Sequence, residues 1–294
     1  MGITIKRVAI LGRHEDPHVA ELMNTLVGHL TKAGITVVAS DDFATEQSVE
    51  HVAEEQLADS ADLMIAIGGD GTMLYAGHLL LESGVPLLGI NRGRLGFLAD
   101  VSPNEDFETL DRITDGEYES EHRMLLTAEV QSDNGTRDCG IAMNDVVIKR
   151  PDNGRMLEFR SYVDERYVNT HGGDGFIVAT PTGSTAYALS CGGPIVTPGL
   201  DALVLAPICP HTLSDRPVVI PGSSISHIDL GETQNDSATV SCDGEVTGQL
   251  GTGERLRIAA ADQRVELIHP VGYDYYGILR SKLHWGRGNR NPSR

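Results

Sequence analysis

Positive charge is scarce in this chain of 294 residues. It carries 23 Lys and Arg against 42 Asp and Glu, a formal net charge of −19, and only four of its basic residues are lysines. Such acidity argues against nucleic acid or an anionic membrane as the main partner. A polyphosphate ligand would need backbone amides, arginines or a divalent cation to offset its charge, and the scarcity of lysine favours a metal cation.

Cysteine pairs and long apolar runs are also missing. The four cysteines are widely separated and form no Cys-x-x-Cys pair, which favours reduced thiols over a zinc site or a disulfide framework. No apolar run approaches the ~18 residues of a membrane span. The first ten residues are too short and mixed for a signal peptide. We therefore expect a soluble, cytoplasmic protein whose length suits two domains.

The most informative motif is a glycine-rich turn around one acid, Gly68-Gly69-Asp70-Gly71-Thr72. It follows an apolar run at 63–67, which predicts a buried strand, and it opens onto a helix-like stretch at 73–81. Glycines let backbone N–H groups approach a phosphate closely, and a helix N-terminus adds its positive end. The turn therefore predicts a phosphate-binding loop.

Asp70 makes this loop unusual, because a carboxylate repels phosphate unless it binds a metal or takes a proton from a substrate hydroxyl. That feature indicates phosphoryl transfer, and the alternative is that Asp70 only caps the helix. Two familiar loops are excluded. Leu74 stands where the dinucleotide fingerprint needs its third glycine, and the chain has no Gly-Lys pair for a P-loop.

Strands and helices alternate in the first third of the chain, which predicts an α/β domain with a parallel sheet. In such sheets ligands bind at the carboxyl ends of the strands, where the glycine-rich turn falls. The expected strands are 7–11, 36–39, 63–67 and 85–90, and helical spacing predicts helices over 19–30 and 47–58.

After about Gly116 the pattern changes to short strand-like runs separated by turn signals, which predicts an all-β, sandwich-like domain. We place the α/β (Rossmann-like) domain at 1–118, the β-rich domain at 119–270, and a C-terminal helix and tail at 271–294.

The β-rich half contains a second glycine-rich run, Gly172-Gly173-Asp174-Gly175, followed by a strand and the hydroxyl-rich segment 180–190. Hydroxyls and N–H groups at a helix start suit a phosphate or a ribose, and Tyr187 can face a base. The alternative is a polar loop with a Ser- and Thr-rich helix cap.

Asn144-Asp145 precedes another predicted strand. An amide beside a carboxylate can hold vicinal ribose hydroxyls, although the pair alone is also an ordinary turn signal. The segments 210–214 and 243–245 are weak signals in isolation.

Taken in order, these segments resemble the NAD kinases over nearly the whole chain, from the first strand to about Trp285. The first signature is shared with phosphofructokinases and diacylglycerol-type lipid kinases, whereas the segment 180–187 is much more specific. The resemblance is carried by 68–72, 89–98, Asn144-Asp145, 174–187, 192–194 and 210–217.

The resemblance implies an α/β domain plus a β-sandwich-like domain, with the active site in the cleft between them. It implies transfer of the ATP γ-phosphate to the 2′-hydroxyl of the adenosine ribose of NAD, giving NADP, with Mg²⁺ or a similar ion. Family members are usually homodimers or homotetramers, joined largely through the second, dinucleotide-binding domain.

By resemblance, Asp70 is the proton acceptor, and no metal ligand is identified. The residues expected to bind the ATP phosphates are Gly68, Gly69, Gly71 and Thr72. The expected NAD contacts are Asp70, Gly71, Asn144, Asp145, Arg155, Asp174, Thr182, Thr185, Ala186, Tyr187, Ala188, Leu189, Ser190, Cys209 and Glu245.

Two alternatives remain open: a lipid or sugar kinase with the same first loop, and a non-catalytic NAD sensor. The pairing of Asn144-Asp145 with 180–187 argues against the first, and a sensor would have no need of the charge on Asp70. The glycine-rich run at 172–173 leaves the preference between NAD and NADH open.

Overall fold

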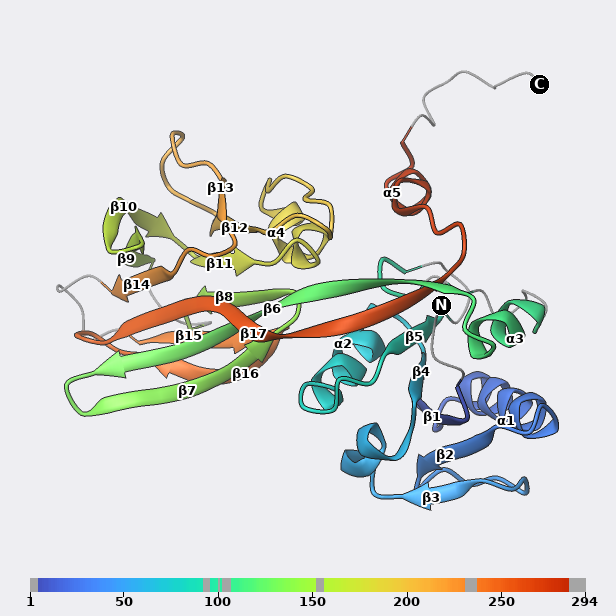
Figure 1. Ribbon diagram of the computed structural model, residues 1–294. Coiled ribbons are helices and arrows are strands. Elements are labelled where there is room, and N and C mark those ends of the chain that lie inside the picture. Colours follow the sequence, from blue (N-terminus) through green and yellow to red (C-terminus); the bar gives the residue numbers. More distant parts are fainter. Residues whose placement is uncertain are drawn as a thin grey trace, which may run out of the picture. The chain divides into compact units, whose positions relative to one another are not determined.

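The computed structural model describes residues 5–91, 96–99, 101, 107–151, 156–230 and 237–285 (Figure 1). The chain divides into two compact units. Unit 1 comprises Met1–His122 with Val265–Arg294, and unit 2 comprises Arg123–Arg264. Within the described ranges, no helix is both long and apolar enough to cross a membrane. The expected tail from Gly286 lies outside these ranges.

Unit 1 is built on a parallel sheet with the strand order β3-β2-β1-β4-β5-β17. All five residues of β4 are buried, as expected for a strand that is covered on both faces. The predicted α/β class is therefore confirmed. The strands are β1 (Arg7–Gly12), β2 (Thr36–Ser40), β3 (Glu50–Val52), β4 (Leu63–Ile67), β5 (Leu87–Ile90) and the last part of β17 (Arg255–Pro270).

Helices cover both faces of this sheet. One apolar cluster joins α1 and α3 to the same face of β1, β4 and β5. The opposite face carries α2, because a Cβ on Gly89 would lie 2.8 Å from the sulfur of Met73, while Leu88 and Ile90 belong to the first cluster. The helices of unit 1 are α1 (Pro17–Lys32), α2 (Asp70–Leu79), α3 (Glu108–Thr114) and α5 (Tyr275–Lys282).

The start of α1 follows from its sequence. The Asp16 carboxylate accepts the N–H of His18, and Pro17 occupies the first turn, where its missing N–H costs nothing.

The predicted helix over 47–58 is wrong. The chain there forms the short strand β3, followed by two 3₁₀ turns at Glu54–Gln56 and Ala58–Ser60. β3 pairs in parallel with β2 at the sheet edge, and His51 Nδ1 lies 3.1 Å from the Ser40 carbonyl. Backbone pairing at a sheet edge outweighs the weak local preference for helix.

Unit 2 is a sandwich of two sheets built from antiparallel strand pairs. One sheet has the order β13-β12-β11-β8-β15-β16, and the other contains β10-β9-β14-β17 together with β6 and β7. One apolar core takes side chains from both sheets. The predicted sandwich-like β domain is confirmed. Its strands are β6 (Tyr118–Ser132), β7 (Gly135–Ala142), β8 (Asp145–Lys149), β9 (Leu157–Val163), β10 (Arg166–Gly173), β11 (Gly175–Ala179), β12 (Ala202–Ile208), β13 (Val218–Pro221), β14 (Ser226–Leu230), β15 (Ala238–Cys242) and β16 (Glu245–Leu250).

The six-stranded sheet has a second apolar layer on its outer face. Val147 of β8 and Ile177 of β11 belong to this layer, whereas their neighbours in the sequence point into the sandwich core. Ala188 of the short helix α4 (Tyr187–Ser190) packs on it and is fully buried. The hydroxyl-rich segment is thereby fixed to the outer face of this sheet.

Candidate functional site

In unit 1 the glycine-rich turn joins the end of β4 to the start of α2. The N–H of Gly68 donates to the Ile90 carbonyl (2.9 Å), which anchors the turn to the neighbouring strand. Gly69 and Gly71 are exposed, and a Cβ at either position would meet no atom within 4 Å. The first N–H groups of a helix have no partner within the helix and favour anions. The backbone of this turn is therefore open to a phosphate.

Asp70 is the first residue of α2, and its carboxylate is held by the backbone of a neighbouring loop. Oδ1 accepts the N–H of Leu98 (3.0 Å), and Oδ2 accepts the N–H of Phe97 (3.2 Å). A Cβ on Gly96 would lie 2.3 Å from Oδ1, so this approach requires glycine. The helix N-cap is Gly69 and no side chain caps it, so the interpretation of Asp70 as only a cap is wrong.

Thr72 is the third residue of α2, and its hydroxyl packs against the backbone of Gly68, where a Cβ would lie 2.3 Å from the Thr72 hydroxyl oxygen. No group of three or more His, Cys, Asp or Glu that could hold a metal occurs among the residues that the structure describes.

In unit 2 a cavity of about 520 Å³ opens on the outer face of the six-stranded sheet. It brings together four of the predicted dinucleotide residues: Asn144, Asp145, Ala186 and Tyr187. Its other lining residues are Val147, Lys149, Arg150, Pro151, Thr239, Ser241, Asp243, Gly244 and Val246. Apolar side chains, hydroxyls and cations thus converge beside one buried acid, the mixture that small-molecule sites typically show.

Asp145 is that buried acid, with 5% of its surface exposed. Burial raises the pKa of its carboxyl to about 7, and the nearby charge of Asp243 adds to the rise. A carboxyl with this pKa is partly protonated near neutral pH, so it can donate a hydrogen bond as well as accept one. Beside the Asn144 amide, it offers the donors and acceptors that vicinal hydroxyls need.

The hydroxyl-rich segment holds the backbone of this acidic turn. The N–H of Thr180 donates to the Asn144 carbonyl (2.9 Å), and its hydroxyl donates to the Met143 carbonyl (2.6 Å). A Cβ on Gly183 would lie 2.0 Å from the Asn144 carbonyl oxygen, so only glycine fits there. The segment 180–190 and the pair Asn144-Asp145 are therefore linked physically, because the first holds the backbone of the second in place.

The other predicted residues of this segment differ in exposure. Thr182 is buried, with its hydroxyl 3.4 Å from a guanidinium nitrogen of Arg123. The Thr185 hydroxyl donates to the Thr182 carbonyl (3.2 Å), Leu189 is half-buried, and Ser190 is exposed. Glu245 is exposed at the start of β16. Arg155 lies outside the described residues, as do Arg92 and Arg94.

Asp174 and Cys209 are linked to the cavity through Arg150. The Asp174 carboxylate accepts from Arg150 Nε (2.7 Å), and this hydrogen bond holds the pKa of Asp174 below its usual value. The Cys209 thiol also hydrogen-bonds to Asp174, and Arg150 itself lines the cavity. Asp174 thus binds a cation that the sequence did not single out, and Cys209 is linked to that cation through Asp174.

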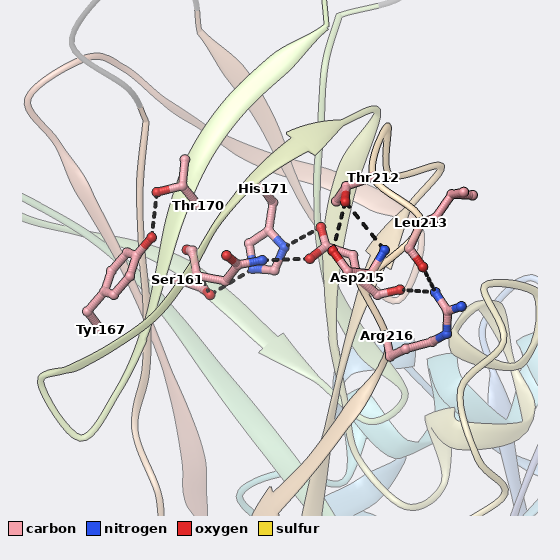
Figure 2. A network of polar contacts seen from close by, with 10 residues as sticks. Ser161, Tyr167, Thr170, His171, Thr212, Leu213, Asp215 and Arg216 are labelled. Carbon is pink, nitrogen blue, oxygen red and sulfur yellow. Dashed lines mark hydrogen bonds and ion pairs between the residues drawn. The ribbon is translucent and has the colours of Figure 1, made fainter.

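A buried polar network secures the loop that follows Cys209 (Figure 2). His171 Nδ1 lies 3.0 Å from Asp215 Oδ2, and His171 Nε2 lies 2.9 Å from Ser161 Oγ. Asn169 donates to the other oxygen of Asp215 (2.6 Å). The network therefore ties Asp215, at the end of the loop, to two neighbouring strands, β9 and β10.

The hydrogen bonds connect Ser161 to His171 and His171 to Asp215, as in the Ser-His-Asp triad of hydrolases. This arrangement cannot work as a catalytic triad. Ser161 is 0% exposed, so no substrate carbonyl can reach its oxygen. The His171 ring also stacks on Phe159, with ring centroids 5.1 Å apart. The network stabilises the loop.

Sequence reasoning gave little weight to Lys149, Arg150, Thr239, Ser241 and Asp243, all of which line the cavity. A signal for them exists. Side chains alternate between the two faces of a strand, so positions 145, 147 and 149 of β8 share one face. In the same way, positions 239 and 241 of β15 share a face with position 243, which directly follows that strand. Only the pairing of β8 with β15, which are far apart in sequence, places those two faces side by side.

Comparison with known proteins covers both halves of the chain. Residues 8–118 match the ATP-NAD kinase N-terminal domain, and residues 143–270 match the ATP-NAD kinase C-terminal domain. The chain is 42% identical over 290 residues to a NAD kinase of Nitrosococcus oceani, covering 98% of this chain and 99% of the relative. A NAD kinase of Nitrosospira multiformis is 41% identical over 296 residues, with 100% of both chains covered.

Solved structures agree. A NAD kinase from Archaeoglobus fulgidus in complex with ATP superposes with a TM-score of 0.72 at 26% identity, covering 94% of this chain and 99% of that one. Yeast NADH kinase complexed with NADH gives a TM-score of 0.88 at 24% identity, covering 98% and 89%, a likeness of fold. Since both domains and nearly the full length of the relatives match, the chain belongs to the NAD kinase family.

Proposed function

We propose that this protein is an ATP-dependent NAD kinase, which transfers the γ-phosphate of ATP to the 2′-hydroxyl of the adenosine ribose of NAD and releases NADP and ADP. The observation that carries the proposal is the cavity that gathers Asn144, Asp145, Ala186 and Tyr187 in a chain of this family. The family match favours this activity over a lipid or sugar kinase and over a non-catalytic sensor.

In this proposal Asp70 is the general base. Its carboxylate accepts two backbone N–H groups, which fix its orientation and leave lone pairs for a third hydrogen. It takes the proton of the 2′-hydroxyl as that oxygen attacks the γ-phosphorus. The bond between the γ-phosphorus and the β,γ-bridging oxygen breaks, and ADP leaves.

The remaining predicted residues bind the two substrates. The backbone at Gly68, Gly69, Gly71 and Thr72 is proposed to face the ATP phosphates, because it is open and lies at a helix N-terminus. Asn144 and Asp145 are proposed to hold ribose hydroxyls. The other proposed dinucleotide contacts are Gly71, Arg155, Asp174, Thr182, Thr185, Ala186, Tyr187, Ala188, Leu189, Ser190, Cys209 and Glu245.

The divalent cation is proposed to arrive with ATP as part of the substrate. Lysine is scarce, and among the described residues that line the cavity Lys149 is the only lysine. A cation on the phosphate oxygens would offset the charge that develops in transfer. We also propose that the protein is cytoplasmic, in keeping with its four free cysteines. We propose that it forms a homodimer or homotetramer, as members of the family usually do.

The decisive assay supplies the purified protein with NAD, ATP and Mg²⁺ and detects NADP with an NADP-specific dehydrogenase. We expect NADP to accumulate, and to stop accumulating when a chelator exceeds the Mg²⁺. Absence of NADP under these conditions would contradict the proposed function. Full activity in excess chelator would contradict the proposed cation.

A further inference from the structure

Asp243 has a main-chain conformation that few residues adopt. It forms, with Gly244, the two-residue turn between β15 and β16, and both residues have a positive φ, of 50° and 89°. Such turns suit antiparallel strands and accept Asp or Asn followed by Gly. The N–H of Asp243 donates to the Asp145 carbonyl (3.0 Å), which brings its side chain against the turn that begins β8.

The Asp243 carboxylate binds three consecutive backbone N–H groups. Oδ2 accepts from Met143 (2.7 Å), and Oδ1 accepts from Asn144 (2.7 Å) and Asp145 (3.1 Å). Successive N–H groups that converge in this way form a concave site for an anion. Here the anion is supplied by a side chain almost a hundred residues away.

The same segment is held from its carbonyl side by Thr180, as described above. Asp243 takes the N–H groups and Thr180 takes the carbonyls, so the backbone that carries Asn144 and Asp145 is fixed from two directions. A shift at either partner would redirect both side chains in the cavity.

We propose that Asp243 is a positioning residue of the dinucleotide site, whose carboxylate fixes the Met143–Asp145 backbone and thereby aims the Asn144 and Asp145 side chains at the ribose. This inference rests on the proposed function and deepens it. Asp243 also acts on Asp145 through its charge, which adds to the effect of burial on the pKa of that carboxyl. The other titratable or charged groups of the cavity lining are Lys149, Arg150 and Tyr187, and Cys191 also interacts with Asp145.

The chain contains a matched control in Asp164. It lies in the two-residue turn between β9 and β10, also with positive φ (49°), and its N–H donates to the Ile225 carbonyl (3.0 Å). Its carboxylate accepts the Ile225 N–H (2.9 Å) and the Ser224 hydroxyl (3.0 Å). Asp164 thus also fixes a distant segment from a turn, through one backbone N–H and one hydroxyl instead of three backbone N–H groups. The segment that it holds carries none of the predicted dinucleotide residues.

The experiment compares Asp243→Asn, Asp164→Asn and the wild type, each as the full chain. The readouts are NAD affinity by calorimetric titration from pH 5.5 to 8.5, KM for NAD and for ATP, and the denaturant midpoint. For Asp243→Asn we expect NAD affinity to fall about tenfold, with the KM for ATP unchanged. The midpoint of the change in NAD affinity with pH, expected near the Asp145 pKa of about 7, should move to lower pH.

For Asp164→Asn we expect a comparable loss of stability with NAD affinity within about twofold of the wild type. Unchanged NAD affinity in folded Asp243→Asn would overturn the proposal, and so would an equal loss of NAD affinity in both variants. If Asp243→Asn does not fold, Asp243→Glu, which keeps the charge on a longer side chain, is judged by the same two criteria of NAD affinity.

Failure of the proposed function is distinguishable. A wild type that binds NAD but makes no NADP contradicts the proposed function, while the binding comparison still tests Asp243. A wild type that does not bind NAD overturns both.

Discussion

Asp70 in unit 1 and Asp145 in unit 2 are both candidate functional acids, but their surroundings are opposite. Asp70 stands at a helix start, half-buried, with its carboxylate bound by two backbone N–H groups. Asp145 starts a strand, is almost fully buried, and has a pKa raised to about 7 by burial and by Asp243. Two backbone N–H groups orient the first carboxylate, whereas burial favours the neutral form of the second carboxyl. One residue type can thus serve as base in one unit and as a hydrogen-bonding group for hydroxyls in the other.

The largest effect is expected from Asp70→Asn, which keeps the shape of the side chain and removes the base. We expect kcat to fall about 10²- to 10⁴-fold, the usual contribution of a general base. Steady-state assays with NAD and ATP check this. A variant with near wild-type kcat would place the base elsewhere and remove the contrast between the two acids.

Asp145→Asn tests the other side of the comparison through stability. The unfolded chain releases the Asp145 proton near pH 3.8, whereas the folded protein holds it to about pH 7. Between these values the folded state binds more protons, so its free energy of unfolding falls as the pH rises. A difference of about three pKa units corresponds to at most about 4 kcal/mol.

The asparagine variant cannot ionise, so it should lack this part of the fall in stability between pH 4 and pH 7. Urea unfolding at several pH values measures the difference between variant and wild type. A difference that stays constant across this pH range would show that Asp145 ionises as easily in the folded protein as in the unfolded chain.

Substitution of one glycine in each unit, Gly71 or Gly183, is expected to have smaller effects than substitution of the two acids. A Cβ at Gly183 would collide with the Asn144 carbonyl, so Gly183→Ala should cost about 1–3 kcal/mol of stability and weaken NAD binding. A Cβ at Gly71 would enter open space in a helical turn, so Gly71→Ala should keep or slightly raise stability and increase the KM for ATP. Denaturation and kinetics on both variants check this. A raised KM for ATP in Gly183→Ala together with weakened NAD binding in Gly71→Ala would contradict the roles given to the two loops.

Much of unit 1 was predictable because its signals are local. The apolar run of β4, the glycine-rich turn and the helix after it are contiguous, and each has its own sequence signature. The helix predicted over 47–58 failed because its apolar spacing is ambiguous, and the pairing of β3 with β2 decided the outcome.

In unit 2 the local sequence signals predict strands but not how those strands pair. The apolar alternation at 256–258 and at 265–267 predicts strands. It does not say that both runs belong to one continuous strand, β17, which pairs with β14 at one end and with β5 of the parallel sheet at the other. The link from Asp243 to Asn144 spans about a hundred residues, and that from His171 to Asp215 spans 44. Such contacts depend on strand pairing, which residue types alone do not specify.

In the proposed function Asp70 serves the chemistry, while Asp145 serves dinucleotide binding. Calorimetric titration of NAD into Asp70→Asn and Asp145→Ala, side by side with the wild type, tests it most directly. We predict wild-type affinity for Asp70→Asn, and for Asp145→Ala a loss of about ten- to a hundredfold, the effect of removing a strong hydrogen bond. Unchanged affinity in Asp145→Ala, or a comparable loss in Asp70→Asn, would contradict the account.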